Sequence, residues 1–258
     1  MNRLFLLLGL LYGSICYAGE PWVAPDNPSP KAILSEARAD KKAGRYQQAL
    51  LKHLWFHDNA LRLSPAMAGV RLSFALSDWL RLGEVYPPAL AKLRATYQTT
   101  EDRIRDEHQV RVRSQDFHDA AALNRVLRQD ERTAELFRWL DRNDPEDAQR
   151  LYQFAQSALL QEEDYALCSK YINTERDLYL IKQTASVDAY SPSDAMQRSI
   201  GSLFVRRAAT LVAILAVNQR FDEAQLVVDD LESFTSDEHL NHELQRALSF
   251  ALDGVFPN

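Results

Sequence analysis

Apolar residues recur three and four positions apart along most of the chain from residue 30 onward, and this spacing places them on one face of an α-helix. Met196, Ile200, Leu203 and Leu211, for example, fall on one stripe of the stretch that follows Pro192. No segment alternates apolar and polar residues for long enough to indicate a β-strand. The pattern predicts an all-α protein. The expected helices are residues 30–43, 46–63, 66–82, 87–98, 100–113, 116–128, 130–142, 145–161, 164–172, 175–185, 193–218, 222–233 and 236–253.

Turn residues mark where the second of these helices begins and ends. Gly44 ends the helix before it, because glycine adopts the left-handed conformation of a helix C-cap without steric strain. Tyr46 and Ala49 then begin the helix, where a small alanine lets two helices approach closely. The helix ends near Leu63, because Pro65 disfavours helical angles in the residue before it. Residues 44–65 therefore form a turn, a helix and the end of that helix.

The turn at Gly44 recurs along the chain, each time with an aromatic residue just after the turn and a small residue three positions beyond the aromatic. The copies are residues 44–49, 83–89, 163–168 and 219–224. The aromatic residues Tyr46, Tyr86 and Tyr165 lie 40 and 79 residues apart, and Phe221 follows after 56. The first two spacings are close to one and two periods of about 40 residues, which favours a helical repeat.

These residues resemble the tetratricopeptide-repeat (TPR) family, whose helical hairpin carries Gly-x-Tyr-x-x-Ala at its central turn and Ala-Leu-x-x-x-Pro at its end. Both pieces are present in residues 44–65, although one extra helical turn separates them and Asp40 stands where the family has an aromatic residue. The resemblance implies an all-α, TPR-like α-α solenoid of helical hairpins. It also implies a protein or peptide partner, bound along the face formed by the first helix of each hairpin. The candidates on that face are Arg71, Asp78, Arg150, Gln153 and Gln197.

Aromatic side chains crowd the first two hairpins and add one more candidate. Trp55 lies on a different face of its helix from His57, so this helix is apolar around most of its circumference. Such a helix is either packed between its neighbours or lines a groove, where rigid aromatic side chains often anchor a partner. Trp55 is therefore a further partner-binding candidate, with packing in the core as the alternative.

Residues 1–18 have the pattern of a signal peptide. Arg3 supplies a positive charge, residues 4–11 are apolar, and Cys16 and Ala18 are small residues at a cleavage site. We expect export to the periplasm, or secretion from the cell, and no transmembrane span after cleavage. An uncleaved peptide or a lipid anchor is the alternative.

The rest of the chain divides by composition. Residues 19–29 form a proline-rich flexible lead-in, and residues 30–258 form the TPR-like helical repeat domain. Turn residues between 173 and 193 interrupt the repeat, which indicates a kink in one solenoid. Cys168 is the only cysteine left once residues 1–18 are removed, and we expect it to pack as a small apolar residue between helices.

The net charge and the positions of the histidines limit the ligands that this protein can bind. The chain has a net charge of −6 at pH 7, which argues against nucleic acid as a partner, and the pair Arg206-Arg207 does not change this balance. His53 and His57 stand four positions apart on one helix, so both rings can face one metal ion. Nothing in the sequence supplies a third ligand, and both histidines continue apolar rows, so the other interpretation is hydrogen bonding within a helix interface.

The sequence contains no motif for a catalytic nucleophile and no glycine-rich phosphate loop. We therefore expect no catalytic residues, no cofactor and no metal. The favoured function is a non-enzymatic scaffold that binds a protein or peptide. The first alternative is a metal-binding protein or metal-dependent enzyme that uses His53 and His57, and the second is a self-assembling structural component of the cell envelope.

Overall fold

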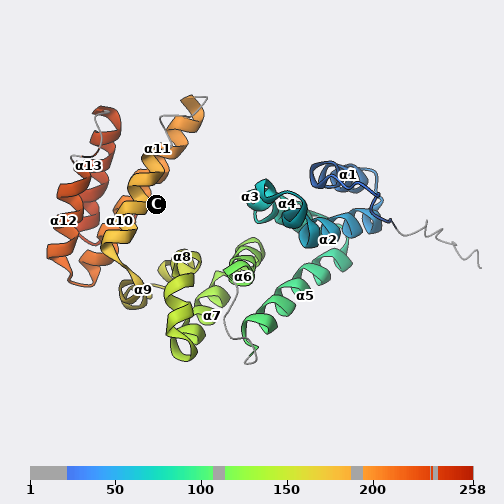
Figure 1. The fold of residues 1–258 in the computed structure, drawn as a ribbon, viewed down its shortest axis with the longest axis horizontal. Helices are drawn as coiled ribbons and strands as arrows, with labels where there is room; N and C mark the ends of the chain where they lie inside the picture. Colours follow the sequence, from blue (N-terminus) through green and yellow to red (C-terminus); the bar gives the residue numbers. More distant parts are fainter. Residues whose placement is uncertain (1–21, 107–113, 187–193, 233, 235–237, 258) are drawn as a thin grey trace, which may run out of the picture. The chain divides into compact units, whose positions relative to one another are not determined.

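The computed structural model describes residues 22–106, 114–186, 194–232, 234 and 238–257. Every regular element in these ranges is a helix, so the predicted all-α class is confirmed (Figure 1). The elements are α1 (Pro30–Lys42), α2 (Tyr46–Leu63), the 3₁₀ helix η1 (Pro65–Met67), α3 (Ala68–Arg71), α4 (Phe74–Gly83), α5 (Pro87–Ile104), α6 (Ser114–Leu127), α7 (Asp130–Asn143), α8 (Pro145–Gln161), α9 (Tyr165–Tyr171), α10 (Thr174–Ser186), α11 (Asp194–Val217), α12 (Phe221–Glu232) and α13 (Glu238–Leu252).

Two predicted boundaries are wrong. The helix expected at 66–82 is divided between η1, α3 and α4, and the break falls at Ser73, whose hydroxyl donates to the carbonyl of Gly69 at 2.6 Å. A serine that bonds to the backbone in this way competes with the helical ladder. The break expected near residue 99 is absent, because α5 continues to Ile104. The Thr100 side chain is buried there and accepts a hydrogen bond from Arg103, so it stabilises the helix.

The described helices form two compact units, one ending at Thr96 and the other beginning at Tyr97, so the division falls inside α5. In the N-terminal unit α1 packs against α2, and α2 packs against α4. Its core contains Phe56, Leu76 and Trp79, each 1% exposed. The indole Nε1 of Trp79 donates to the backbone carbonyl of Ala89 at 2.9 Å, which ties α4 to the start of α5.

In the C-terminal unit α7 packs against α8, and α11 packs against α10, α12 and α13 (Figure 1). Rings from α7, α8 and α9 meet in its core, where the centroid of Phe137 lies 6.0 Å from that of Tyr152 and 5.2 Å from that of Tyr171. Residues 197–217 of α11 are long and apolar enough to cross a membrane by length and composition alone. In the most apolar window 56% is buried among its neighbours, so this helix packs in the core of the unit.

Three of the four predicted turns share one backbone geometry. Gly44, Glu163 and Gln219 all have positive φ angles, of 76°, 54° and 62°. In each turn the next residue donates its N–H to a carbonyl five positions earlier, which is the hydrogen bond of a Schellman helix end. Arg128 makes a fourth turn of this kind, at the end of α6. The turn at Gly83 differs, because Gly83 has no positive φ. Its lack of a side chain instead lets α4 approach α5 closely.

The small residue of each predicted turn is fully buried. Ala49, Ala89, Cys168 and Ala224 are all 0% exposed, which confirms that Cys168 packs as a small core residue. Burial raises the pKa of the Cys168 thiol to about 11, so the side chain stays protonated at neutral pH.

The predicted signal peptide lies outside the described residues, as do residues 187–193 of the predicted kink. The described part of the proline-rich lead-in, residues 22–29, contains no helix. It is nevertheless attached to α2, because the ring of Trp22 meets that of Trp55 edge to face at 6.3 Å. The Lys52 ammonium also lies 5.6 Å from the Trp22 ring, within cation–π range.

Candidate functional site

A groove with a volume of about 930 Å³ lies in the C-terminal unit. Its walls come from α8 on one side and from α10 and α11 on the other, with single contributions from Arg125 of α6 and Tyr165 of α9. These segments are distant in sequence, so the groove exists only after the unit folds. Its volume is at the upper end of the range for ligand pockets.

The α8 wall carries side-chain amides. Gln149, Gln153, Gln156 and Leu160 follow one another at spacings of four, three and four residues, so they lie on one face of the helix. The Gln149 amide donates to the Tyr171 carbonyl at 3.0 Å and the Gln156 amide donates to the Tyr152 hydroxyl at 3.1 Å, which leaves their amide oxygens as acceptors. The Gln153 amide is exposed and can both donate and accept. This wall can therefore hydrogen-bond to a chain segment without selecting its side chains.

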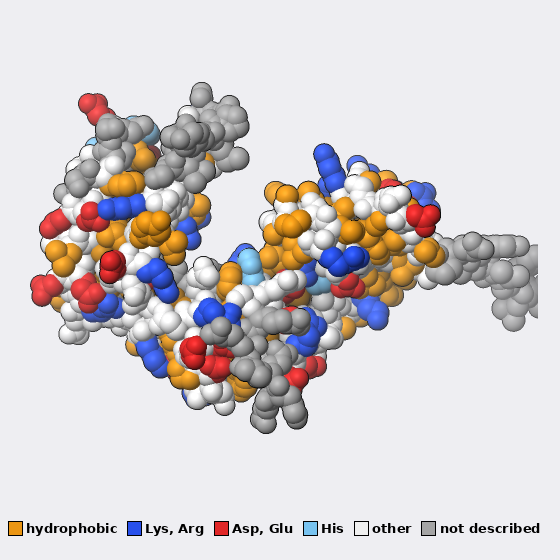
Figure 2. Space-filling model, viewed as in Figure 1, with side chains coloured by type: hydrophobic (Ala, Val, Ile, Leu, Met, Phe, Trp, Pro, Cys, Tyr) orange, Lys and Arg blue, Asp and Glu red, His pale blue; other side chains and the backbone are white. Residues whose placement is uncertain are grey.

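The opposite wall combines apolar and basic side chains. Leu180 of α10 and Leu203 of α11 line the groove and are 45% and 36% exposed. One turn beyond Leu203 on α11 stand Arg206 and Arg207, both exposed. Figure 2 shows basic and hydrophobic side chains beside one another on the visible face of the C-terminal helices. This wall offers apolar contact and positive charge together.

Positive charge dominates the groove. Five arginines line it, whereas the described lining residues include one acid, Asp177. Arg176 pairs with Asp177 at 2.9 Å, and Arg150 pairs with the buried carboxylate of Asp147 at 2.6 Å. The guanidinium of Arg207 donates to the neutral hydroxyl of Thr184 at 2.9 Å. Among the described lining residues the single acid is already paired with Arg176, so the groove keeps a net positive charge.

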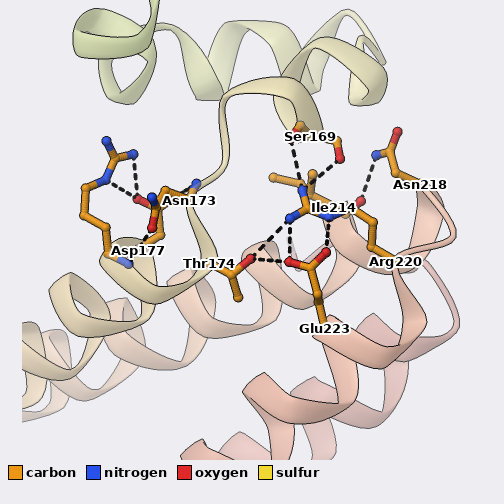
Figure 3. Close-up of polar contacts among 9 residues, drawn as sticks. Ser169, Asn173, Thr174, Asp177, Ile214, Asn218, Arg220 and Glu223 are labelled. Atoms are coloured by element: carbon orange, nitrogen blue, oxygen red, sulfur yellow. Dashed lines mark hydrogen bonds and ion pairs between the residues drawn. The ribbon is translucent and has the colours of Figure 1, made fainter.

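Arg220 fixes the helices behind the groove (Figure 3). Its guanidinium donates to the backbone carbonyl of Ser169 at 3.0 Å, to the hydroxyl of Thr174 at 3.3 Å, and to both carboxylate oxygens of Glu223 at 2.6 and 2.8 Å. These bonds join the end of α9, the start of α10 and the start of α12. The hydrogen bond from Arg220 holds the pKa of Glu223 below its usual value, with a further contribution from Thr174.

Figure 3 also shows the cap of α10 and the side chain of Asn218, which follows α11. The Asn173 side chain caps α10 by accepting from the backbone N–H of Arg176 at 2.9 Å, and Asp177 accepts from the backbone N–H of Asn173 at 3.1 Å. Asn218, just after α11, donates to the carbonyl of Tyr165 at 3.0 Å. Asn218 thus anchors the end of α11 to α9, and the Asn173 cap fixes the first turn of α10.

The C-terminal tail closes one end of the groove. Gly254 has a φ angle of 78° and turns the chain after α13, so that Phe256 and Pro257 reach the groove lining. The Phe256 ring stacks on that of Tyr165, with centroids 4.8 Å apart and planes inclined by 13°. The tail supplies apolar surface at the α9 end.

The structure places the sequence-predicted candidates in three settings. Arg150 and Gln153 come together in the groove. Gln197 is exposed near the start of α11, outside the described groove lining. Trp55, Arg71 and Asp78 belong to the N-terminal unit.

The three candidates of the N-terminal unit make packing and polar contacts within that unit. Arg71 is 4% exposed and donates to the backbone carbonyl of His57 at 2.6 Å. Asp78 is 9% exposed and pairs with Arg38 at 2.6 Å and with Arg81. Trp55 is partly buried and packs against the core cluster of Phe56 and Ala60. These side chains stabilise the unit, and a partner-binding role for them stays a prediction.

His53 and His57 hold a tryptophan between helices. The ring of His53 stacks on Trp79 with centroids 6.3 Å apart, and that of His57 meets the same indole edge to face at 5.9 Å. Arg71 Nη2 lies 3.2 Å from His57 Nε2. Burial lowers the pKa of His53 to about 4, so this ring is neutral at pH 7. Among the described residues no three metal-binding side chains gather around this pair or elsewhere.

The residues that give the groove its charge carry little signal in the sequence. Arg206 and Arg207 form only a local basic pair there, and nothing distinguishes Arg125 or Arg176 from other surface arginines. The available signal was the order Leu203, Arg206, Arg207, Thr210 on α11, an amphipathic stripe that faces the groove. Its meaning depends on α8 and α10 lying opposite, which no local pattern reveals.

Comparison of the chain with protein-family models, with curated proteins and with solved structures finds no match. The likeness to TPR proteins consequently depends on the turn and helix-end residues of the sequence alone. What the groove binds has to be inferred from its own side chains.

Proposed function

We propose that this protein is a non-enzymatic, exported, TPR-like helical repeat scaffold, which binds a protein or peptide partner in the groove of its C-terminal unit. The observation that carries the proposal is the composition of the groove. Exposed leucines face glutamine amides across a space of about 930 Å³, with arginines at its margin. Apolar side chains supply binding energy, and the amides and guanidinium groups orient the ligand.

The recurring turns support the repeat part of the proposal. Three of the four predicted turns share a positive φ angle and the same pair of backbone hydrogen bonds, although only one of them has glycine at that position. In all four turns the small residue is fully buried. The same helix end also occurs at Arg128 and Gly254, so the buried small residues are the stronger support for a repeat. Helical repeats commonly use a shared face to bind partners.

A photocrosslinking experiment tests the binding site. A photoreactive amino acid replaces Gln153, which is exposed and lines the groove, and in a matched variant it replaces Gln245, which is exposed on α13 outside the described lining. Irradiation of envelope preparations from the source cell should link one dominant protein to position 153 and little to position 245. Equal labelling at both positions, or no product at position 153, would contradict the proposal.

Exposed apolar residues on α12 give one specific observation in favour of a self-assembling component instead. Phe221 and Leu226 are 56% and 67% exposed. Sedimentation of the purified protein over a range of concentrations separates the two functions. A monomer at all concentrations favours the scaffold, and concentration-dependent oligomers that Leu226→Ser disperses would favour self-assembly.

A further inference from the structure

We infer that the groove of the C-terminal unit is built for an acidic peptide segment, one that places carboxylates against Arg206 and Arg207 and an apolar side chain against Leu180 and Leu203. This inference rests on the proposed binding function and names the chemistry of the partner. It begins from a contrast of charge. The chain as a whole carries −6, whereas the side chains that line the groove carry five positive charges and one negative charge.

The positive charges divide into a structural and an available group. Arg150 and Arg176 are committed to Asp147 and Asp177. Among the described residues, no carboxylate forms an ion pair with Arg206, and Arg207 donates only to the hydroxyl of Thr184. Guanidinium groups bind carboxylates through two parallel hydrogen bonds, so two adjacent arginines in an open groove match a ligand with closely spaced acids.

Arg125 extends the available charge to the α6 side of the groove. Its side chain is exposed and lines the groove. Burial raises the pKa of the nearby Asp130, and the positive charge of Arg125 acts in the opposite direction. Arg206 of α11, Arg125 of α6 and the α8 glutamines all line the groove, so an extended ligand can contact all of them. Its backbone would then meet amides that can accept hydrogen bonds, and at Gln153 an amide that can also donate. The groove therefore fits an extended run of residues better than a single small anion.

Apolar side chains in the groove favour an acidic peptide over other classes of anionic ligand. Leu180 and Leu203 are exposed, and their apolar side chains cannot bind a phosphate group. They suit contact with an aliphatic or aromatic side chain of a peptide. Single-stranded nucleic acid binds by stacking bases on open aromatic rings. Tyr152 is 3% exposed, and Phe256 covers one face of Tyr165, so the groove offers few open ring faces to a base. The overall negative charge also repels a long polyanion.

Fluorescence anisotropy with the full exported chain tests this inference. The probe is a short labelled synthetic peptide of glutamate and leucine, and its control has glutamine in place of every glutamate. We expect the acidic peptide to bind at least about tenfold more tightly than the control at low salt, with affinity that falls as salt is added.

Charge reversal locates the effect. The double variant Arg206→Glu/Arg207→Glu should lose binding of the acidic peptide by about tenfold or more. The matched variant Arg142→Glu/Arg246→Glu makes the same change of net charge at two exposed positions outside the described lining and should bind like the unmodified chain. Circular dichroism confirms that both variants keep their helices, so that a loss of binding is not a loss of fold.

Three outcomes would overturn the inference: equal binding of the glutamine peptide, equal weakening by both double variants, or tighter binding of oligothymidylate or of anionic lipid vesicles. Its failure is distinguishable from failure of the proposed function. If a protein crosslinks at Gln153 through a segment without acidic residues, only the inference of an acidic ligand fails and the proposed binding site stands. Failure of the crosslink at Gln153 itself removes the binding site.

Discussion

The ring of Phe256 stacks on the ring of Tyr165, with centroids 4.8 Å apart, and so joins the last residues of the chain to the start of α9. We expect Phe256→Ala to lower the free energy of unfolding by about 1–2 kcal/mol, because the stacked pair and its buried area are lost together. Phe250, which is 52% exposed, provides the control. Phe250→Ala should change stability by less than about 0.5 kcal/mol in the same urea titration. Equal losses would show that the stack contributes nothing.

The approach of α4 to α5 leaves no room for a side chain at Gly83. A Cβ atom there would lie 2.9 Å from the Cβ of Leu90 and 3.1 Å from its backbone. We expect Gly83→Ala to destabilise the N-terminal unit by about 1–3 kcal/mol, since the helices must separate. Gly69→Ala is the matched control, because a Cβ there meets nothing within 4 Å. If thermal unfolding gives the same midpoint for both variants, the close approach is wrong.

Burial of His53 makes the stability of the N-terminal unit depend on pH. Its pKa is about 4 when folded and about 6.5 when unfolded, so between these values the unfolded chain binds more protons. The contribution of His53 is complete above pH 6.5 and is lost as the pH falls towards 4. We expect a loss of about 2 kcal/mol between pH 7 and pH 5.

Two variants isolate this effect from other titrating groups. His53→Gln should flatten the pH dependence measured by urea unfolding between pH 7 and pH 5. His242→Gln removes an exposed histidine and should leave the dependence unchanged. A His53→Gln profile that still parallels that of the unmodified chain would rule His53 out as the source.

Arg220 joins α9, α10 and α12 through hydrogen bonds to Ser169, Thr174 and Glu223. We expect Arg220→Ala to lower the unfolding free energy by about 1–2 kcal/mol and to speed amide hydrogen exchange at the start of α10. Arg246→Ala, at an exposed position on α13, should do neither. Unchanged exchange in α10 would contradict the role of Arg220 as the anchor of that helix.

The Arg220–Glu223 contact also has a pH dependence with a definite sign. The folded pKa of Glu223 is depressed, so its contribution is present above its unfolded pKa and is lost as the pH falls through the lower folded value. Acid should therefore weaken the junction, and Glu223→Gln should remove that part of the acid sensitivity. Comparison of the two unfolding profiles below pH 5 measures it.

Local residues were enough to predict most helices. Pro30, Gly44, Tyr46 and Pro145 mark helix ends by their own conformational limits, and the structure begins or ends helices at or next to these positions. The break at Ser73 was missed because it depends on which backbone group its hydroxyl bonds to, a choice that composition leaves open.

The groove could be predicted only in part. Arg150 and Gln153 were proposed from their place on the first helix of a hairpin, and both line it. Arg71 was proposed by the same logic, yet it is buried against His57, because the helix expected at 66–82 is broken and no longer presents one continuous face. Arg206 gains its significance from α8, some 50 positions earlier in the chain, and no periodicity within α11 reports on that neighbour.

Hydrogen exchange of the exported protein, with and without the partner captured at Gln153, tests the central claim most directly. Binding in the groove predicts slower exchange in α8, α10 and α11 and unchanged exchange in α1 and α2. Protection confined to α1 and α2, or spread evenly over the described helices, would contradict the claim that the groove of the C-terminal unit is the binding site.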